Sequence, residues 1–171
     1  EEKYQIVFCG SGAEAKQISS WVKQSLPSEL AEAFFKIADN ILLTGDFDYD
    51  KYFQPFLSIM QNSFLATLIN NCDIYVRRTL RYRYLDALDQ AGIAVDIFGN
   101  SWPQGRFKHH RLHEPVNHEE ALHIMDCSHL SLCISDSKPF GSHERVLDEM
   151  LRGNICLTTR SSFWQEHFNE N

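Results

Sequence analysis

Hydrophobic residues follow two patterns along this chain, namely short continuous runs and longer stretches with helical spacing. The continuous runs predict buried strands at residues 5–9, 93–98, 130–134 and 155–159, with a further short strand at 110–113. Helical spacing, together with proline and glycine stop signals, predicts helices at residues 13–26, 28–41, 52–69, 76–91, 119–127, 142–152 and 161–168.

The order of these elements indicates the fold class. From residue 73 onward helices and strands alternate, which is typical of βαβ units that form a parallel sheet. We therefore expect an α/β, Rossmann-like parallel sheet with helices on both faces. The 171 residues are enough for one domain, 1–171, with a helical insertion at 13–72 and core units at 73–168.

In such sheets ligands bind at the carboxyl ends of the strands. The predicted strands end at four polar or glycine-containing segments. We expect these segments to converge on one crevice: Gly10-Ser11, Gly99-Asn100, residues 135–141 and Thr158-Thr159.

Charge and composition narrow the possible partners. The chain has 16 basic and 23 acidic residues and a net charge of −7, which argues against a general nucleic-acid binder. No apolar stretch approaches the roughly 20 residues of a membrane-spanning helix. Five scattered cysteines without a CxxC pair predict reduced thiols in a reducing compartment, so we expect a cytoplasmic protein without a zinc site.

The segment from Phe140 to Gly153 carries the strongest local signal. Gly141 leaves room for a ligand, and Ser142 as an N-cap would open a helix whose free N–H groups favour a diphosphate. Arg145 would add positive charge, and Asp148 could accept hydrogen bonds from ribose hydroxyls. The alternative is an ordinary amphipathic helix, whose apolar face would be Val146, Leu147, Met150 and Leu151.

Other candidates carry less information. Gly10-Ser11-Gly12 lacks the full GxGxxG pattern, and a plain turn explains it equally well. Arg78 or Arg81 could bind phosphate, or both could belong to a solvated helix face. Four histidines lie close together in the sequence, but no metal-ligand spacing with a supporting carboxylate can be identified among them, so no metal is expected. They are His109, His110, His113 and His118.

Together these segments resemble the C-terminal, donor-binding half of GT-B glycosyltransferases, and most of all the spore-maturation-protein-like (CgeB-like) family. The similarity lies in Val7 to Ser11, in Arg78 to Leu88 followed by Ile93 to Gly99, and in His143 to Gly153. Position 140, where the wider group has an acid, is Phe in this chain. This departure puts in doubt a contact from that position to the donor sugar.

The resemblance implies a nucleotide-diphosphate sugar as donor substrate, with no metal and no further cofactor. The diphosphate would lie near Gly10, Ser11 and the turn 141–145, in which Glu144 would serve the helix dipole or sugar hydroxyls. Asp148 would take the place of the ribose-binding carboxylate. The remaining implied donor contacts are the crevice floor and the base loop, namely Gly99, Asn100, Pro115 and Val116, and His143 within the turn.

The resemblance therefore implies a hexosyltransferase-type enzyme acting on an unknown acceptor, which is a glycan, a protein or a small molecule. GT-B enzymes have two such domains, so we expect an N-terminal acceptor domain before residue 1, and no catalytic residue is assigned. The alternative is a non-catalytic interaction module with a degenerate nucleotide site. A dinucleotide binder is a weaker third possibility, because the glycine pattern is incomplete.

Overall fold

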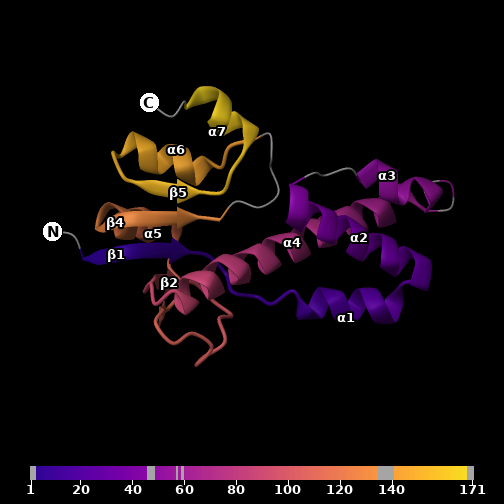
Figure 1. Ribbon diagram of the computed structural model, residues 1–171, viewed down its shortest axis with the longest axis horizontal. Coiled ribbons are helices and arrows are strands. Elements are labelled where there is room, and N and C mark those ends of the chain that lie inside the picture. The colour runs from indigo at the N-terminus through magenta and orange to yellow at the C-terminus, as the bar shows by residue number, and fades with distance from the viewer. Residues whose placement is uncertain (1–2, 46–48, 57, 59, 135–140, 169–171) are drawn as a thin grey trace. The chain divides into compact units, whose positions relative to one another are not determined.

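The computed structural model describes residues 3–45, 49–56, 58, 60–134 and 141–168. The chain divides into two compact units, which are considered separately. Unit one comprises residues 1–13 together with 81–171, and unit two comprises residues 14–80. The long helix α4 (Asn62–Gln90) contributes to both, with its C-terminal part in unit one (Figure 1).

Unit one is built on one parallel sheet, which within the described residues has five strands in the order β3-β2-β1-β4-β5. Every neighbouring pair is parallel, and Figure 1 shows β1, β4 and β5 as arrows pointing the same way. The strands are β1 (Tyr4–Cys9), β2 (Asp96–Phe98), β3 (Arg111–His113), β4 (Ser128–Cys133) and β5 (Cys156–Thr158). The predicted α/β, Rossmann-like fold is confirmed.

Helices cover both faces of this sheet because successive side chains of a strand point to opposite faces. Val7 and Cys9 of β1 pack with Met125 of α5 (His118–Asp126). Phe8, between them in the sequence, packs on the other face with Leu85 of α4. The other helices of this unit are α6 (Glu144–Leu151) and α7 (Ser162–His167).

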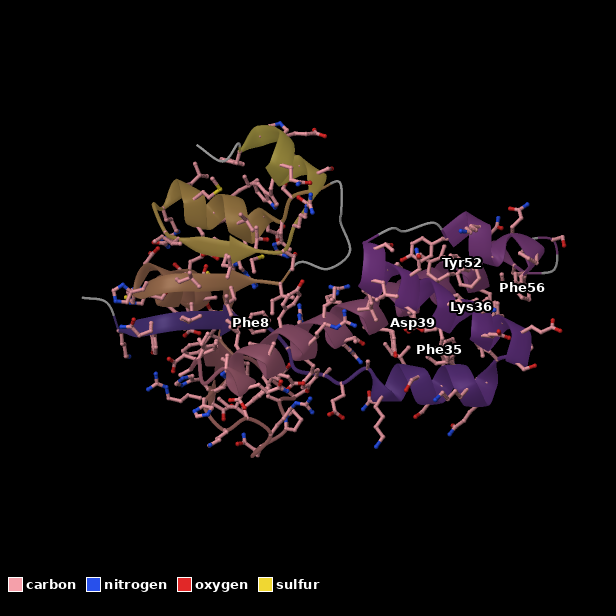
Figure 2. All side chains as sticks on the ribbon, in the orientation of Figure 1. Phe8, Phe35, Lys36, Asp39, Tyr52 and Phe56 are labelled. Carbon is pink, nitrogen blue, oxygen red and sulfur yellow. The ribbon has the colours of Figure 1, made fainter. Side chains whose placement is uncertain are left out.

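Unit two is the helical insertion that was predicted after the first strand. It contains α1 (Lys16–Ser25), α2 (Ser28–Thr44), α3 (Tyr49–Phe53), the 3-10 turn η1 (Gln54–Phe56) and the first part of α4. Its core includes Phe34 and Ile37 of α2 and Leu68 of α4, all fully buried. Tyr52 and Phe56, labelled in Figure 2, pack against this core from α3 and η1.

The prediction of one continuous helix at 52–69 is wrong. The helical turns that begin at Tyr49 end with η1, and α4 starts afresh at Asn62 and runs unbroken to Gln90. Pro55 explains the break, because proline lacks an N–H and its ring clashes with the preceding turn. The predicted stop at Ala91-Gly92 is correct, since Gly92 has a φ of 75° and α4 ends two residues earlier.

In the part of the chain that the structure describes, no helix combines the length and the apolar character needed to cross a membrane.

Candidate functional site

A cleft of about 290 Å³ lies where β1 and β2 end in unit one. Its walls come from the loops after these two strands, from the start of α5 and from one side chain of α6. The residues that line it are Cys9, Gly10, Ser11, Phe98, Gly99, Asn100, Pro115, Val116, Asn117, His118, Ala121 and Arg145. The cleft thus occupies the strand-end position at which ligands bind in open parallel sheets.

The loop after β1 is held by side chains that reach its backbone carbonyls. Four consecutive carbonyl oxygens, at residues 9–12, each accept a hydrogen bond from a different side chain. These bonds run from Arg145 Nη1 to Cys9 (2.7 Å), from Trp102 Nε1 to Gly10 (2.9 Å), from Arg81 Nη1 to Ser11 (2.9 Å) and from Tyr82 Oη to Gly12. Carbonyl oxygens repel anions, so their engagement by protein donors makes the loop more favourable to a negatively charged ligand.

Backbone packing between the two loops requires glycine at position 99. The Gly10 N–H donates to the Phe98 carbonyl at 2.8 Å, and the Gly12 N–H donates to the Asn100 carbonyl at 2.9 Å. A Cβ atom added to Gly99 would lie 2.0 Å from the Gly10 carbonyl oxygen, which is backbone and has little freedom to move. The two loops therefore form one close-packed floor.

The third wall of the cleft is the N-terminus of α5. Asn117 caps this helix, with its side chain accepting from the Glu120 N–H at 2.9 Å while Glu120 accepts from the Asn117 N–H at 3.1 Å. Asn117 and His118 line the cleft, and the sequence prediction did not include them. The Asn-x-x-Glu spacing of a capping box was the signal that could have identified them.

Arg145 is the side chain through which α6 reaches the cleft. The sequence pattern predicts Ser142 as the N-cap of this helix, and this prediction is wrong. The N-cap is His143, whose extended backbone (φ −102°, ψ 133°) lets its Nδ1 accept from the Arg145 N–H at 3.2 Å. The helix therefore begins at Glu144, and Arg145 lies in its first turn.

The face of α6 that packs on the sheet also differs from the prediction. Val146 is buried as expected, but the side chain beside it is Glu149, which has no exposed surface. Leu147, Met150 and Leu151, predicted to point inward, are exposed; the exposed fraction of Leu151 is 88%. The helix is rotated so that Glu149, rather than Leu147 and Leu151, faces the sheet.

The structure brings together only some of the predicted donor-site residues. Seven of them line the cleft: Gly10, Ser11, Gly99, Asn100, Pro115, Val116 and Arg145. Five belong to α6 or the turn before it and lie outside this lining: Gly141, Ser142, His143, Glu144 and Asp148. Arg78 is in unit two, where its Nη1 donates to the Glu14 carbonyl at 3.2 Å.

The four strand-end segments do not all converge, contrary to the prediction. Thr158 and Thr159 line a second pocket, of about 410 Å³, together with apolar side chains such as Leu88 and Leu132. These leucines belong to the cluster on the α4 face of the sheet, whereas Cys9 and Ala121 of the cleft belong to the α5 face. Of the predicted segment 135–141, residues 135–140 lie outside the described residues.

The histidine-rich segment has mainly structural roles. His110 is buried, with Nδ1 3.3 Å from the Val95 backbone nitrogen and Nε2 2.8 Å from the Leu85 carbonyl. The backbone N–H of His109 donates to Asp89 at 2.6 Å, and His113 contacts Asp96. Across the described ranges, no group of three or more His, Cys, Asp or Glu residues could hold a metal ion.

The side chains that line the cleft are suited to binding a ligand. Its titratable lining groups are Arg145, His118 and Cys9, and burial raises the pKa of the Cys9 thiol to about 11, so this thiol is neutral. No carboxylate is among the described residues that line this cleft.

No protein-family model, no curated protein and no solved structure matches the chain. The functional proposal therefore rests on the geometry of the cleft and on the sequence.

Proposed function

We propose that unit one binds the nucleoside-diphosphate part of a nucleotide sugar in the cleft at the ends of β1 and β2. It would thereby act as the donor-binding domain of a metal-independent glycosyltransferase. The observation that carries the proposal is the engagement of the carbonyls of residues 9–12 by side-chain donors beside a lining arginine. This arrangement favours an anion without a metal ion.

The contacts suit the parts of such a ligand. The Arg145 guanidinium would bind phosphate oxygens, supported by the positive end of the α5 dipole at Asn117 and His118. The loop Pro115-Val116 offers an apolar wall for the base. A volume of about 290 Å³ is close to the lower end of small-ligand sites, roughly 300–1,000 Å³, so part of the ligand would extend beyond the cleft.

The proposal is tested by thermal unfolding in the presence of UDP, GDP, ADP, CMP and NAD. At about 100 times its dissociation constant, a ligand stabilises the folded state by about 2.7 kcal/mol, which raises Tm by several degrees. We expect a shift with a nucleoside diphosphate. A shift with NAD alone would favour a dinucleotide binder. No shift with any of them would favour the non-catalytic module.

Two arginines at opposite ends of α6, Arg145 in its first turn and Arg152 at its C-cap, provide a matched pair of variants. Arg145→Ala removes the cleft guanidinium and should weaken nucleoside-diphosphate binding at least about tenfold, because a charge-assisted hydrogen bond is lost. Arg152→Ala removes an equal charge at the other end of α6, where Arg152 pairs with Asp126 outside the cleft. It should bind like the unmodified chain. Equal affinity in both variants would contradict the proposed binding mode.

A further inference from the structure

Glu149 is a buried carboxyl group on α6. It lies on the inner face of α6 with no exposed surface, and neither of its oxygens has a partner among the described residues. Burying an unpaired carboxylate is costly, so such a group normally holds a proton instead. Burial raises the pKa of Glu149 to about 8, from an ordinary value of 4.5. At neutral pH the side chain is therefore mostly uncharged.

Three cysteine thiols on neighbouring strands interact with Glu149. Cys9 of β1, Cys133 of β4 and Cys156 of β5 all interact with its charge, and Cys156 lies close to the carboxyl without good hydrogen-bond geometry. The carboxylate of the neighbouring residue Asp148 also raises the pKa of Glu149. On α5, the Asp126 carboxylate accepts hydrogen bonds from Arg152 and Asn154.

Among the described residues, Arg145 is a cation whose charge acts on this carboxyl, in the direction that lowers the pKa of Glu149. The two residues are four positions apart on α6, so their side chains share one face of the helix. Arg145 also lines the cleft and donates to the Cys9 carbonyl. The guanidinium thus interacts with the buried acid and also lines the proposed anion site.

We propose that the protonation of Glu149 controls the affinity of the cleft for phosphate. With the proton bound, the charge of Arg145 is uncompensated and available to a diphosphate. When Glu149 releases its proton to solvent, the carboxylate attracts the guanidinium and repels the ligand, so binding weakens. Glu149 is a positioning residue that acts through Arg145, and this inference rests on the proposed function.

Linkage makes the effect reciprocal. If loss of the proton weakens anion binding, then anion binding must favour the protonated form of Glu149. Near the pKa of about 8, where the free protein is partly ionised, the complex should therefore take up a fraction of a proton from the buffer. This uptake can be measured on the unmodified chain.

The experiment is calorimetric titration of the chain and its Glu149→Gln variant with UDP, GDP and ADP. Each ligand is titrated at about pH 7 and about pH 9.5, on either side of the carboxyl titration. For the ligand that binds, we expect the Kd of the unmodified chain to rise at least about fivefold at the higher pH. The Glu149→Gln variant, which carries no ionisable group at this position, should keep nearly the same Kd at both.

Cys133 is the competing explanation, because the hydrogen bond from Cys156 lowers the pKa of its thiol. A Cys133→Ser variant removes that titration and leaves Glu149 in place. Persistence of the pH effect in Glu149→Gln and its loss in Cys133→Ser would overturn the proposal. So would a Kd that does not change with pH in the unmodified chain.

Proton uptake supplies a readout that needs no variant. Titrations near pH 8 in two buffers of different ionisation enthalpy should give an uptake of about a third to a half of a proton per bound ligand. Binding without uptake would overturn the role of Glu149 while leaving the proposed function intact. Absence of binding by all three nucleotides at both pH values would overturn the proposed function, and the inference with it.

Discussion

Two carboxyl groups are buried in the described part of unit one, and they differ in their partners. Asp96, on β2, is 3% exposed; its Oδ2 accepts from Arg111 Nη2 at 2.9 Å, and its Oδ1 lies 2.7 Å from His113 Nε2. Glu149, on α6, is fully buried, and its oxygens have no hydrogen-bond partner among the described residues. The β2–β3 side of the sheet thus holds an ion-paired carboxylate, and the β4–β5 side holds a neutral acid.

This difference shows two ways in which the same fold accommodates a buried carboxyl group. Asp96 has hydrogen-bond partners in Arg111 and His113, so removing its charge leaves these two side chains without their partner. Glu149 keeps its proton, so it is the presence of a charge that destabilises the fold. The same chemical change, from carboxyl to amide, should therefore have opposite effects at the two positions.

The largest expected effect is that of Glu149→Gln on stability at alkaline pH. Between about pH 4.5 and pH 8 the unfolded chain has released this proton while the folded chain still binds it. The free energy of unfolding should therefore fall as the pH rises, by about 1.4 kcal/mol per unit and on the order of 5 kcal/mol in all. The variant lacks this loss and should be more stable above about pH 8.

Chemical denaturation of both proteins from about pH 5 to about pH 9 measures this difference. The two stability curves should lie close together at the acidic end and separate steadily up to about pH 8. Parallel curves would mean that Glu149 is already ionised in the folded state, and the contrast with Asp96 would disappear.

A substitution that changes no charge shows whether these effects are electrostatic. Gly99→Ala places a Cβ against the Gly10 carbonyl oxygen and should destabilise unit one by about 1–3 kcal/mol. The cost should be the same across the pH range. In the matched variant Gly10→Ala, the added Cβ lies nearest to the tip of the Phe8 ring. This variant should therefore destabilise unit one less. Denaturant unfolding of the two variants measures both, and a smaller cost at position 99 would contradict the packed floor.

Asp96→Asn should destabilise the protein, by about 1–2 kcal/mol at neutral pH. The carboxylate accepts hydrogen bonds on both oxygens, and an amide can accept on only one. The cost is limited because Arg111 and His113 are partly exposed and water can solvate them. Denaturant unfolding near pH 7 checks the sign. Stabilisation by this variant would show that Asp96, like Glu149, is an uncompensated acid.

The smallest effect is expected for Arg111→Met. The Arg111 side chain is 65% exposed, so its pairing with Asp96 should contribute less than about 1 kcal/mol and should weaken with added salt. Thermal unfolding at low and high salt measures this contribution. A large, salt-independent loss would instead make Arg111 the principal partner of the buried carboxylate.

Local sequence signals were sufficient for most of the sheet and too weak for the cleft. Apolar runs ending in glycine located β1 and β2, because a buried strand and its turn involve only neighbouring residues. The donors that hold residues 9–12 lie on α4, after β2 and on α6, between 70 and 136 residues away in the sequence. No local pattern reveals such pairings.

Two other differences have local causes. Hydrophobic periodicity placed the leucines of α6 inward, but it gave no weight to a protonated acid, which can be buried without a counter-charge. Pro55 was visible in the sequence and should have ended the helix predicted across it. Asn117 and Glu120 likewise carried a capping signal that would have added the start of α5 to the cleft.

The most direct test of the central claim is an amide NMR titration of the isotope-labelled chain with UDP, GDP and ADP. We expect one of them to shift the signals of Gly10, Ser11, Gly99 and Asn117, which line the cleft. Shifts confined to the apolar pocket, at residues such as Leu88 and Leu157, would contradict it. So would the absence of any shift with all three nucleotides.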